Sequence, residues 1–210
     1  MKKIMLLSLL IIACDVNVDN NNISDALKKM DEAKSYIDEG DYYLAIKALD
    51  SAIELHSDFP AAFKKRGDIN LKLENNYEAI FDYTKALELN PRLTDCYFER
   101  ASAKINLKDY ESAVEDFTSY INITLKDGFS PDVAAYSNRA MMRVNTGDYS
   151  GSISDYSSAI ELEPNNGRHY NNRGLSKINL GDYKSGCVDL SKALELNYSK
   201  ANDNINNYCI

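Results

Sequence analysis

The sequence predicts an all-α protein made of helix pairs that repeat along the chain. The segments "FKKRGDINLKLENNY", "YFERASAKINLKDY", "YSNRAMMRVNTGDY" and "YNNRGLSKINLGDY" share one skeleton. The small residue shortly after each turn recurs at steps of 34, 34, 39 and 34 residues, at Ala45, Ala79, Ala113, Ser152 and Gly186. Only four prolines interrupt the 210 residues, and 44% of the residues are hydrophobic. A fixed period of this length is typical of stacked helical repeats.

A 34-residue period of paired amphipathic helices resembles the tetratricopeptide repeat (TPR) family. The resemblance runs from about residue 26 to residue 198 and implies a right-handed α-solenoid of about five helix-turn-helix repeats with a short C-terminal capping helix. The expected repeats are 26–59, 60–93, 94–132, 133–166 and 167–200, and the expected cap is 199–210. The segment "ITLKDGFSP" adds five residues to the third repeat.

Small residues and turn residues carry this pattern within each repeat. The position where the first helix should cross the second holds Ala33, Gly67, Ala101, Ala140 and Gly174. Small side chains let two helix backbones approach closely. In "GDY" turns, glycine is expected to end one helix and aspartate to cap the next.

Arginine and aspartate recur together in four repeats. The pairs are Arg66 with Asp82, Arg100 with Asp116, Arg139 with Asp155, and Arg173 with Asp189. The first repeat has Glu32 and Ala48 at these positions. We therefore predict partly buried ion pairs within each repeat that support helix packing. The alternative is a row of arginines that binds an anionic ligand.

The N-terminal segment "MKKIMLLSLLIIAC" predicts export. Its ten-residue apolar run is too short to span a membrane but is typical of a secretory signal peptide. Its end resembles a bacterial lipobox, which implies cleavage after residue 13 and lipidation of Cys14. Residues 14–25 are then a polar tether, and the chain is expected to be lipid-anchored in a bacterial cell envelope, with inner or outer membrane left open. The alternative is an ordinary signal peptide with a chance cysteine.

Charge and cysteine usage narrow the possible partners. The net charge is −8, which repels nucleic acid. Cys96, Cys187 and Cys209 have no spacing typical of zinc, and we expect them to be small, semi-buried residues rather than a disulfide framework. Asp15, Asn17 and Asp19 lack the glycine and glutamate of a calcium loop, so no metal or cofactor is predicted.

Enzyme motifs are missing from the sequence, which contains no Walker A loop, HExxH or GxSxG. His56 and His169 are expected to lack acidic or nucleophilic partners. The prediction is that the protein is not an enzyme; a catalytic site of unrecognised type is a distant alternative.

The TPR resemblance implies a concave groove, lined by the first helix of each repeat, that binds extended peptides or partner helices. Asparagine can both donate to and accept from a peptide backbone. A clamp for a C-terminal carboxylate is not expected, because Phe98, Ser102 and Asn172 stand where its residues belong. The implied groove residues are Lys64, Lys65, Asp68, Phe98, Glu99, Asn138, Asn145, Arg168, Asn171, Asn172 and Asn179. The alternatives are solvated polar positions, or a local pocket near Tyr120 and Phe129.

These observations predict a membrane-anchored scaffold or adaptor that binds a protein or an extended peptide, in envelope or secretion-complex assembly. The alternative function is a glycan- or peptidoglycan-associated helper protein, since an asparagine-rich groove can also hold sugars.

Overall fold

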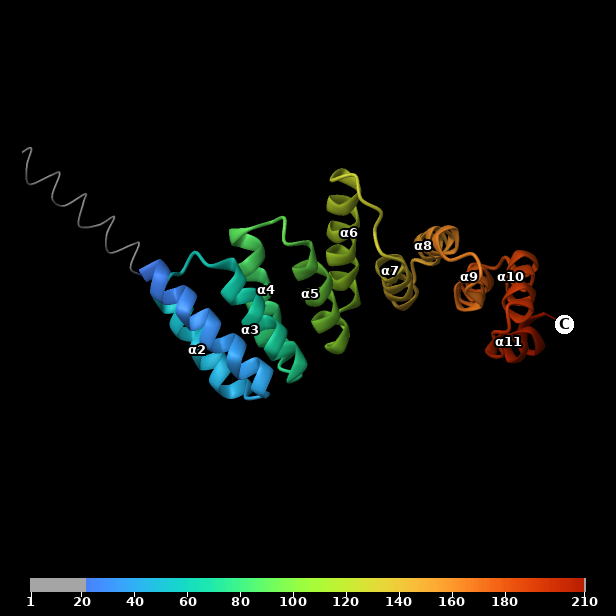
Figure 1. The fold of residues 1–210 in the computed structure, drawn as a ribbon. Helices are drawn as coiled ribbons and strands as arrows, with labels where there is room; N and C mark the ends of the chain where they lie inside the picture. Colours follow the sequence, from blue (N-terminus) through green and yellow to red (C-terminus); the bar gives the residue numbers. More distant parts are fainter. Residues whose placement is uncertain (1–21, 210) are drawn as a thin grey trace, which may run out of the picture. The chain divides into compact units, whose positions relative to one another are not determined.

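The computed structural model describes residues 22–209, which form α-helices joined by short turns without a strand in that range (Figure 1). Residues 22–39 are helical. The later helices are α2 (Tyr42–Leu55), α3 (Pro60–Lys72), α4 (Asn76–Leu89), α5 (Thr94–Asn106), α6 (Tyr110–Lys126), α7 (Val133–Asn145), α8 (Tyr149–Leu162), α9 (Gly167–Asn179), α10 (Tyr183–Glu195) and α11 (Lys200–Tyr208). The all-α class with successive helix pairs is confirmed.

The chain divides into two compact units, one that ends at Cys96 and one that begins at Tyr97. We call them the N-terminal unit and the C-terminal unit. In the N-terminal unit, α2 packs on α3 and α3 on α4. In the C-terminal unit, α6 packs on α7, α7 on α8, α8 on α9, α9 on α10, and α10 on α11.

The N-terminal end of the described chain differs from the expected tether. Residues 22–25 are already helical, although residues 14–25 were expected to be a linker. The apolar positions Ala26, Met30 and Ala33 continue a helical period, and Ala26 and Ala33 belong to the core of the N-terminal unit. The predicted signal peptide (1–13) and Cys14 lie outside the described residues. None of the described helices is long and apolar enough to cross a bilayer.

The turns between paired helices follow the expected chemistry. Gly40, Gly147 and Gly181 have φ angles of 81°, 81° and 95°, the left-handed region that favours glycine. Glu74 and Lys108 take the same region, with φ angles of 62° and 61°. The next helix is capped by an aspartate whose carboxylate accepts a backbone N–H; these aspartates are Asp41, Asp109, Asp148 and Asp182.

Small residues are buried where the helices cross. A Cβ atom added to Gly174 in α9 would lie 2.8 Å from the carbonyl oxygen of Gly186 in α10. Ala101 and Ala113 occupy the corresponding positions in α5 and α6 and are fully buried. The backbones of α9 and α10 therefore approach too closely for any larger residue at Gly174.

The insertion in the third repeat lengthens a helix and adds a loop. Helix α6 has 17 residues, whereas α8 has 14. Tyr120 is buried in the core of the C-terminal unit, and its hydroxyl donates to Asp132 at 2.9 Å. Phe129, in contrast, is 71% exposed. Tyr120 therefore holds the end of the inserted loop against the core, and the two rings do not share one environment.

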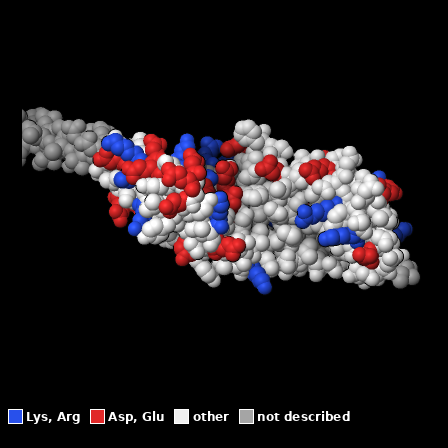
Figure 2. All heavy atoms as spheres, turned by 60° about the horizontal axis from the view of Figure 1, so that its bottom comes forward, with Lys and Arg blue, Asp and Glu red and all other residues white. Residues whose placement is uncertain are grey.

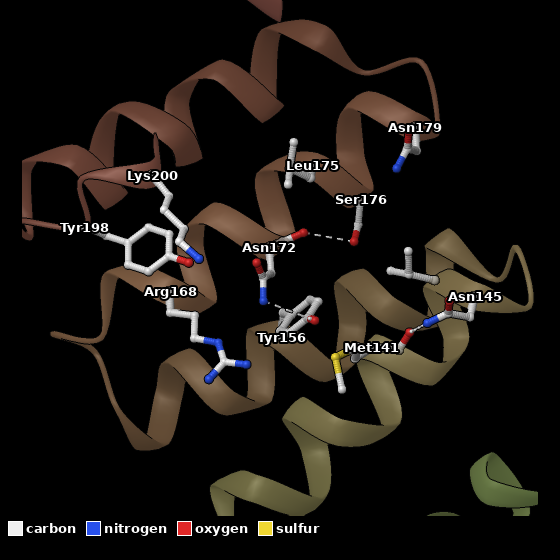
Figure 3. Close-up of a pocket in the computed structure, with 11 residues that line it drawn as sticks. Met141, Asn145, Tyr156, Arg168, Asn172, Leu175, Ser176, Asn179, Tyr198 and Lys200 are labelled. Carbon is white, nitrogen blue, oxygen red and sulfur yellow. Dashed lines mark hydrogen bonds between the residues drawn. The ribbon is translucent and has the colours of Figure 1, made fainter. Parts of the chain in front are cut away.

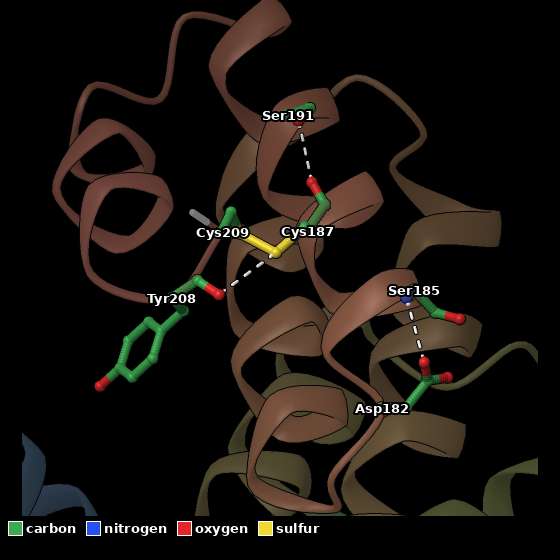
Figure 4. The surroundings of a disulfide bond; sticks show 6 residues. All are labelled: Asp182, Ser185, Cys187, Ser191, Tyr208 and Cys209. Carbon is green, nitrogen blue, oxygen red and sulfur yellow. Dashed lines mark hydrogen bonds between the residues drawn. A yellow bond between two sulfur atoms is a disulfide. The ribbon is translucent and has the colours of Figure 1, made fainter.

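The C-terminal helix is fastened by a disulfide bond that sequence reasoning did not predict. Cys187 in α10 is bonded to Cys209, which directly follows α11, with their Cα atoms 5.6 Å apart (Figure 4). The expectation that these cysteines are unpaired was wrong. Their separation of 22 residues gives no signal in the sequence, because the turn before α11 folds the chain back onto α10. Cys96 is buried and takes no part in this disulfide.

Candidate functional site

Each of the four repeated arginines lies beside the aspartate that the sequence paired with it. The shortest N–O distances are 2.7 Å for Arg66–Asp82, 2.6 Å for Arg100–Asp116, 2.6 Å for Arg139–Asp155 and 2.8 Å for Arg173–Asp189. The aspartate side chains are between 2% and 6% exposed. The guanidinium groups are therefore held between the two helices of a repeat, and this geometry does not suit a row of arginines that grips an external anion.

A second donor reaches each aspartate from four residues farther along the same helix. It is Asn70 for Asp82, Lys104 for Asp116, Arg143 for Asp155 and Lys177 for Asp189. Sequence reasoning missed these donors, although their constant offset of four residues from the arginine was a usable signal. One helical turn brings both donors to the same carboxylate.

Contacts with the preceding repeat are also made by Arg66, Arg139 and Arg173. Arg66 donates to Asp50 in α2, Arg139 to Thr118 in α6 at 3.0 Å, and Arg173 to Ser157 in α8 at 3.1 Å. Each of these arginines therefore joins three helices. The hydrogen bonds that Arg173 donates to Asp189 raise the pKa of the Arg173 guanidinium, so this cation stays charged at any ordinary pH.

In the N-terminal unit, the predicted groove residues are partly engaged with one another. The Lys64 ammonium lies 3.3 Å from the Asp68 carboxylate, which also accepts from the Tyr83 hydroxyl at 3.0 Å. Lys65 is exposed. In this part of the predicted groove, the charges of Lys64 and Asp68 therefore compensate each other.

Helix α5 supplies packing more than binding. The Phe98 ring contacts Phe117 and Tyr120 edge-on, with centroids 5.2 Å and 5.7 Å apart. Phe98 therefore belongs to the aromatic core of the C-terminal unit. Glu99, the other predicted groove residue of α5, is half-buried.

The C-terminal unit contains a cavity of about 660 Å³ between α7, α9 and the chain around residue 198 (Figure 3). Four predicted groove residues line it: Asn145, Arg168, Asn172 and Asn179. Its other lining residues are Met141, Val144, Tyr156, Leu175, Ser176, Tyr198 and Lys200. Asn138 lines an adjoining hollow of about 260 Å³ that shares Met141, Tyr156, Arg168 and Asn172 with the first. We call the two hollows together the α7–α9 groove.

The amide side chains of Asn172 and Asn145 are held in place by hydrogen bonds, one of them to the buried Tyr156. The Tyr156 side chain is 3% exposed, and burial raises the pKa of its hydroxyl. Asn172 donates to this hydroxyl at 3.4 Å, and Asn145 donates to the carbonyl of Met141 at 2.8 Å (Figure 3). Val144 and Leu175 also line the cavity with aliphatic side chains. The groove thus combines amide side chains with an apolar surface, which suits a peptide.

Asn171 is not placed as the groove prediction required. It is 4% exposed, its amide donates to Asn172 at 3.1 Å, and its oxygen accepts from Asn204 in α11 at 2.8 Å. The side chain is therefore used to fasten the C-terminal helix and is not offered to a ligand. Neighbouring helical residues point about 100° apart, so Asn171 and Asn172 cannot share one face.

His169 has partners that the sequence did not reveal. Its Nε2 lies 3.0 Å from the Glu163 carboxylate, and its Nδ1 lies 3.4 Å from the Ser137 hydroxyl. Hydrogen bonds from Asn166 and His169 lower the pKa of Glu163. The expectation that His169 lacks such partners was wrong, because the three residues come from different elements.

A serine, a histidine and a carboxylate in contact could suggest acyl transfer, but that reaction has one more requirement. Such a reaction needs N–H donors aimed at the developing oxyanion beside the nucleophile. Ser137 lies inside α7, where neighbouring N–H groups bond within the helix. The cluster joins α7 to the start of α9. Within residues 22–209 there is also no group of three or more His, Cys, Asp or Glu side chains arranged to hold a metal ion.

Comparison with known families agrees with this architecture. A tetratricopeptide repeat model matches residues 30–94, and a second one matches residues 94–127, 133–166 and 168–200. Together they cover most of the chain. The chain belongs to the tetratricopeptide repeat family. The predicted TPR solenoid class is thereby confirmed, and this fold is one through which proteins interact with other proteins.

Known TPR proteins are similar to this chain over different shares of its length. Serine/threonine-protein phosphatase T from Aspergillus oryzae is 38% identical over 73 residues, which are 35% of this chain and 15% of the phosphatase. The chain thus spans a small part of this relative. Among solved structures, MamA has a TM-score of 0.74 at 20% identity, over 85% of this chain and 94% of MamA. YrrB, described as a TPR protein with an unusual peptide-binding site, has a TM-score of 0.74 at 19% identity, over 86% and 91%. These two structures share the fold.

Proposed function

We propose that this TPR protein is a non-catalytic adaptor that binds an extended segment of a partner protein in the α7–α9 groove. The observation that carries the proposal is the cavity of about 660 Å³, into which Asn145, Asn172 and Asn179 project amides beside aliphatic side chains. Amide groups can pair with a peptide backbone of any sequence, while apolar walls accept side chains. The peptide-binding site attributed to YrrB, which has the same fold, supports this choice of ligand.

The residues that recur for packing are separate from the residues that line the groove. Arg139 and Arg173 donate hydrogen bonds to buried aspartates, whereas Asn145 and Asn179 line the cavity and take no part in these ion pairs. A substitution in the groove is therefore expected to change binding without unfolding the repeats.

Site-specific photocrosslinking in native membranes tests this function. Benzoylphenylalanine is placed at Asn145 in the groove or, as the control, at the exposed Asn122 of α6 in the full chain. Mass spectrometry should recover a defined protein from the Asn145 position only, and Asn172→Ala should reduce the yield. Identical adducts from both positions, or none above background, would count against a binding groove.

Competition separates a peptide ligand from the glycan alternative. A pool of soluble random heptapeptides should suppress crosslinking at Asn145, whereas soluble N-acetylglucosamine oligomers should not. Suppression by the oligosaccharides alone would instead support the glycan-associated helper.

We also propose that the adaptor acts at a bacterial membrane, in envelope or secretion-complex assembly, through a lipid on Cys14. The sequence of residues 1–14 supports this anchor, and the Cys187–Cys209 disulfide supports an oxidising compartment outside the cytoplasm. Metabolic labelling with radioactive palmitate should mark the wild type and not Cys14→Ser, and the variant should leave the membrane fraction. A labelled Cys14→Ser variant would contradict the assignment.

A further inference from the structure

In the larger cavity of the α7–α9 groove, the only charged lining residues are cations. Arg168 and Lys200 line the larger cavity, and no aspartate or glutamate does (Figure 3). Figure 2 shows that lysine and arginine side chains are interspersed with aspartate and glutamate side chains on the displayed face of the molecule. The chain as a whole has a net charge of −8, so a cavity whose charged lining residues are all cations differs from the rest of the molecule.

These two cations have no carboxylate partner within residues 22–209. Five other arginines of the chain, Arg66, Arg100, Arg139, Arg143 and Arg173, form ion pairs with aspartates. Glu163 lines the adjoining hollow together with Arg168, but its carboxylate accepts from Asn166 and His169. Arg168 therefore keeps its donors available, and an incoming carboxylate could use them without displacing an existing ion pair.

The packing of the repeats does not require these cations. The positions that correspond to Arg168 hold Ala61, Asp95 and Ala134 in the three preceding repeats. Lys200 comes from α11, outside the repeated helix pairs. The ion pairs that support helix packing recur from repeat to repeat, whereas Arg168 and Lys200 are not part of that recurring pattern.

The C-terminal segment is held firmly enough to position its part of the cavity. Ala201 is fully buried, and Asn204 donates to Asn171 at 2.8 Å. A Cβ atom added to Gly167 would lie 2.8 Å from Cβ of Tyr198, so Tyr198 packs directly against the start of α9. The Cys187–Cys209 disulfide closes the far end of α11 (Figure 4). The backbone of Lys200, at the start of α11, is therefore held in place.

We infer that the groove selects an internal acidic side chain of the partner segment, bound between Arg168 and Lys200, next to an aliphatic side chain that packs on Val144 and Leu175. This inference rests on the proposed peptide-binding function and names the chemistry of its ligand. The side-chain carboxylate would accept charge-assisted hydrogen bonds from both cations. The position of Lys200 makes the disulfide-fastened cap part of the recognition surface.

The test uses fluorescein-labelled heptapeptide pools and the full chain in detergent, with binding followed by fluorescence polarisation. Two pools have a fixed central leucine, an amidated C-terminus and random flanking positions, and differ only in Glu or Gln beside the leucine. The Glu pool should bind about tenfold more tightly, as expected for charge-assisted hydrogen bonds. Arg168→Gln and Lys200→Gln should each remove most of this preference, whereas Lys126→Gln, at an exposed site on α6, should leave it unchanged.

Two further arms separate the alternatives. A Gln pool with a free C-terminal carboxylate that binds as tightly as the Glu pool would overturn an internal side chain as the source of the anion. The Cys187→Ser/Cys209→Ser variant should weaken the Glu pool more than the Gln pool, and an equal loss from both would contradict a role of the cap in selection.

Failure of this inference can be told apart from failure of the groove itself. Equal binding of the Glu and Gln pools, with Asn172→Ala weakening both, would overturn anion selection and leave the peptide groove intact. If neither pool binds while photocrosslinking at Asn145 still captures a protein, the acidic heptapeptide ligand is wrong and the adaptor function stands. If both experiments fail, both proposals fall.

Discussion

At the scale of single residues, the four buried aspartates differ in how well their charge is compensated. Asp116, Asp155 and Asp189 each meet two cationic side chains. Asp82 meets only Arg66, which it shares with Asp50, because its second donor is the neutral Asn70. Burial raises the pKa of Asp82 in spite of the hydrogen bonds from Arg66. When the folded state raises the pKa of a carboxyl group, the contribution of that group to the free energy of unfolding decreases as pH rises through the folded-state pKa.

The substitution Asn70→Lys should therefore stabilise the N-terminal unit. A second cation beside Asp82 lowers its pKa again and should add about 1 kcal/mol to the free energy of unfolding near neutral pH. The gain should disappear as pH falls below the ordinary aspartate value of 3.8, where Asp82 is protonated in both states. Urea unfolding of the wild type and the variant at several pH values measures this.

The reciprocal variant provides the control. Lys177→Asn removes the second cation from Asp189 and should destabilise by a similar amount near neutral pH. A stabilised Lys177→Asn or a destabilised Asn70→Lys would show that side-chain packing, and not charge compensation, dominates at this position.

The sequence predicts contacts between residues that recur together and misses those that occur once. The pairing of Arg173 with Asp189 follows from their joint presence or absence in each repeat. The contact of Asn171 with Asn204 spans 33 residues and depends on where α11 lies. The Glu163–His169–Ser137 cluster likewise joins separate elements. Neither contact leaves a periodic trace.

At the scale of helices and turns, the N-cap aspartates control where the second helix of each repeat begins. Asp182 accepts the backbone N–H of Ser185 at 3.1 Å, and its hydrogen bonds with Ser185 lower its pKa. A group with a lowered pKa stabilises the fold above its ordinary value of 3.8, and this contribution is lost as pH falls through the folded-state pKa.

The substitution Asp182→Ala should lower the thermal midpoint at neutral pH, because the first turn of α10 loses its cap. The difference from the wild type should shrink as pH falls through the folded-state pKa of Asp182, which lies below 3.8, because the wild-type carboxylate is then protonated. Scanning calorimetry at neutral and acidic pH checks this. Since Asp182→Asn retains a capping oxygen without a titratable charge, a pH-dependent gap between this variant and Asp182→Ala would contradict the assignment.

The turns offer a second prediction at this scale. Glu74 and Lys108 adopt left-handed conformations in which the other repeats use glycine. Glu74→Gly and Lys108→Gly should each stabilise by about 0.5 kcal/mol, since relief of backbone strain outweighs the greater entropy of the unfolded chain. Gly181→Ala should have the opposite effect, because its φ of 95° is strained for any side chain. Thermal midpoints that fall for both glycine variants would contradict this account.

Helix positions were predictable because turn signals recur with the repeat. The predicted repeat 60–93 contains α3 and α4, and the predicted repeat 133–166 contains α7 and α8. The length of α6 was not predictable, because the five extra residues could have formed a loop alone. Tyr120 holds the loop end at Asp132, so part of the insertion remains helical.

At the scale of the whole molecule, a TPR chain is stabilised by contacts between neighbouring helices, and its ends have neighbours on one side only. The C-terminal end compensates in two ways. Helix α11 covers α10 with Ala201 fully buried, and the Cys187–Cys209 disulfide closes a loop of 22 residues. The cap was predictable from the chain left over after the last repeat, whereas the disulfide depended on the path of that cap.

Loss of the disulfide should loosen the C-terminal end selectively. For a loop of this length, a cross-link contributes about 3 kcal/mol, mainly by restricting the unfolded chain. In the Cys187→Ser/Cys209→Ser variant, amide hydrogen exchange should therefore accelerate most in α11, less in α9 and α10, and not in the N-terminal unit. Because repeats gain stability from their neighbours, the effect should decay from α11 toward α7. Uniform acceleration along the whole chain would show that the protein unfolds as one cooperative block, and no acceleration in α11 would show that Ala201 and Asn204 hold the cap without the disulfide.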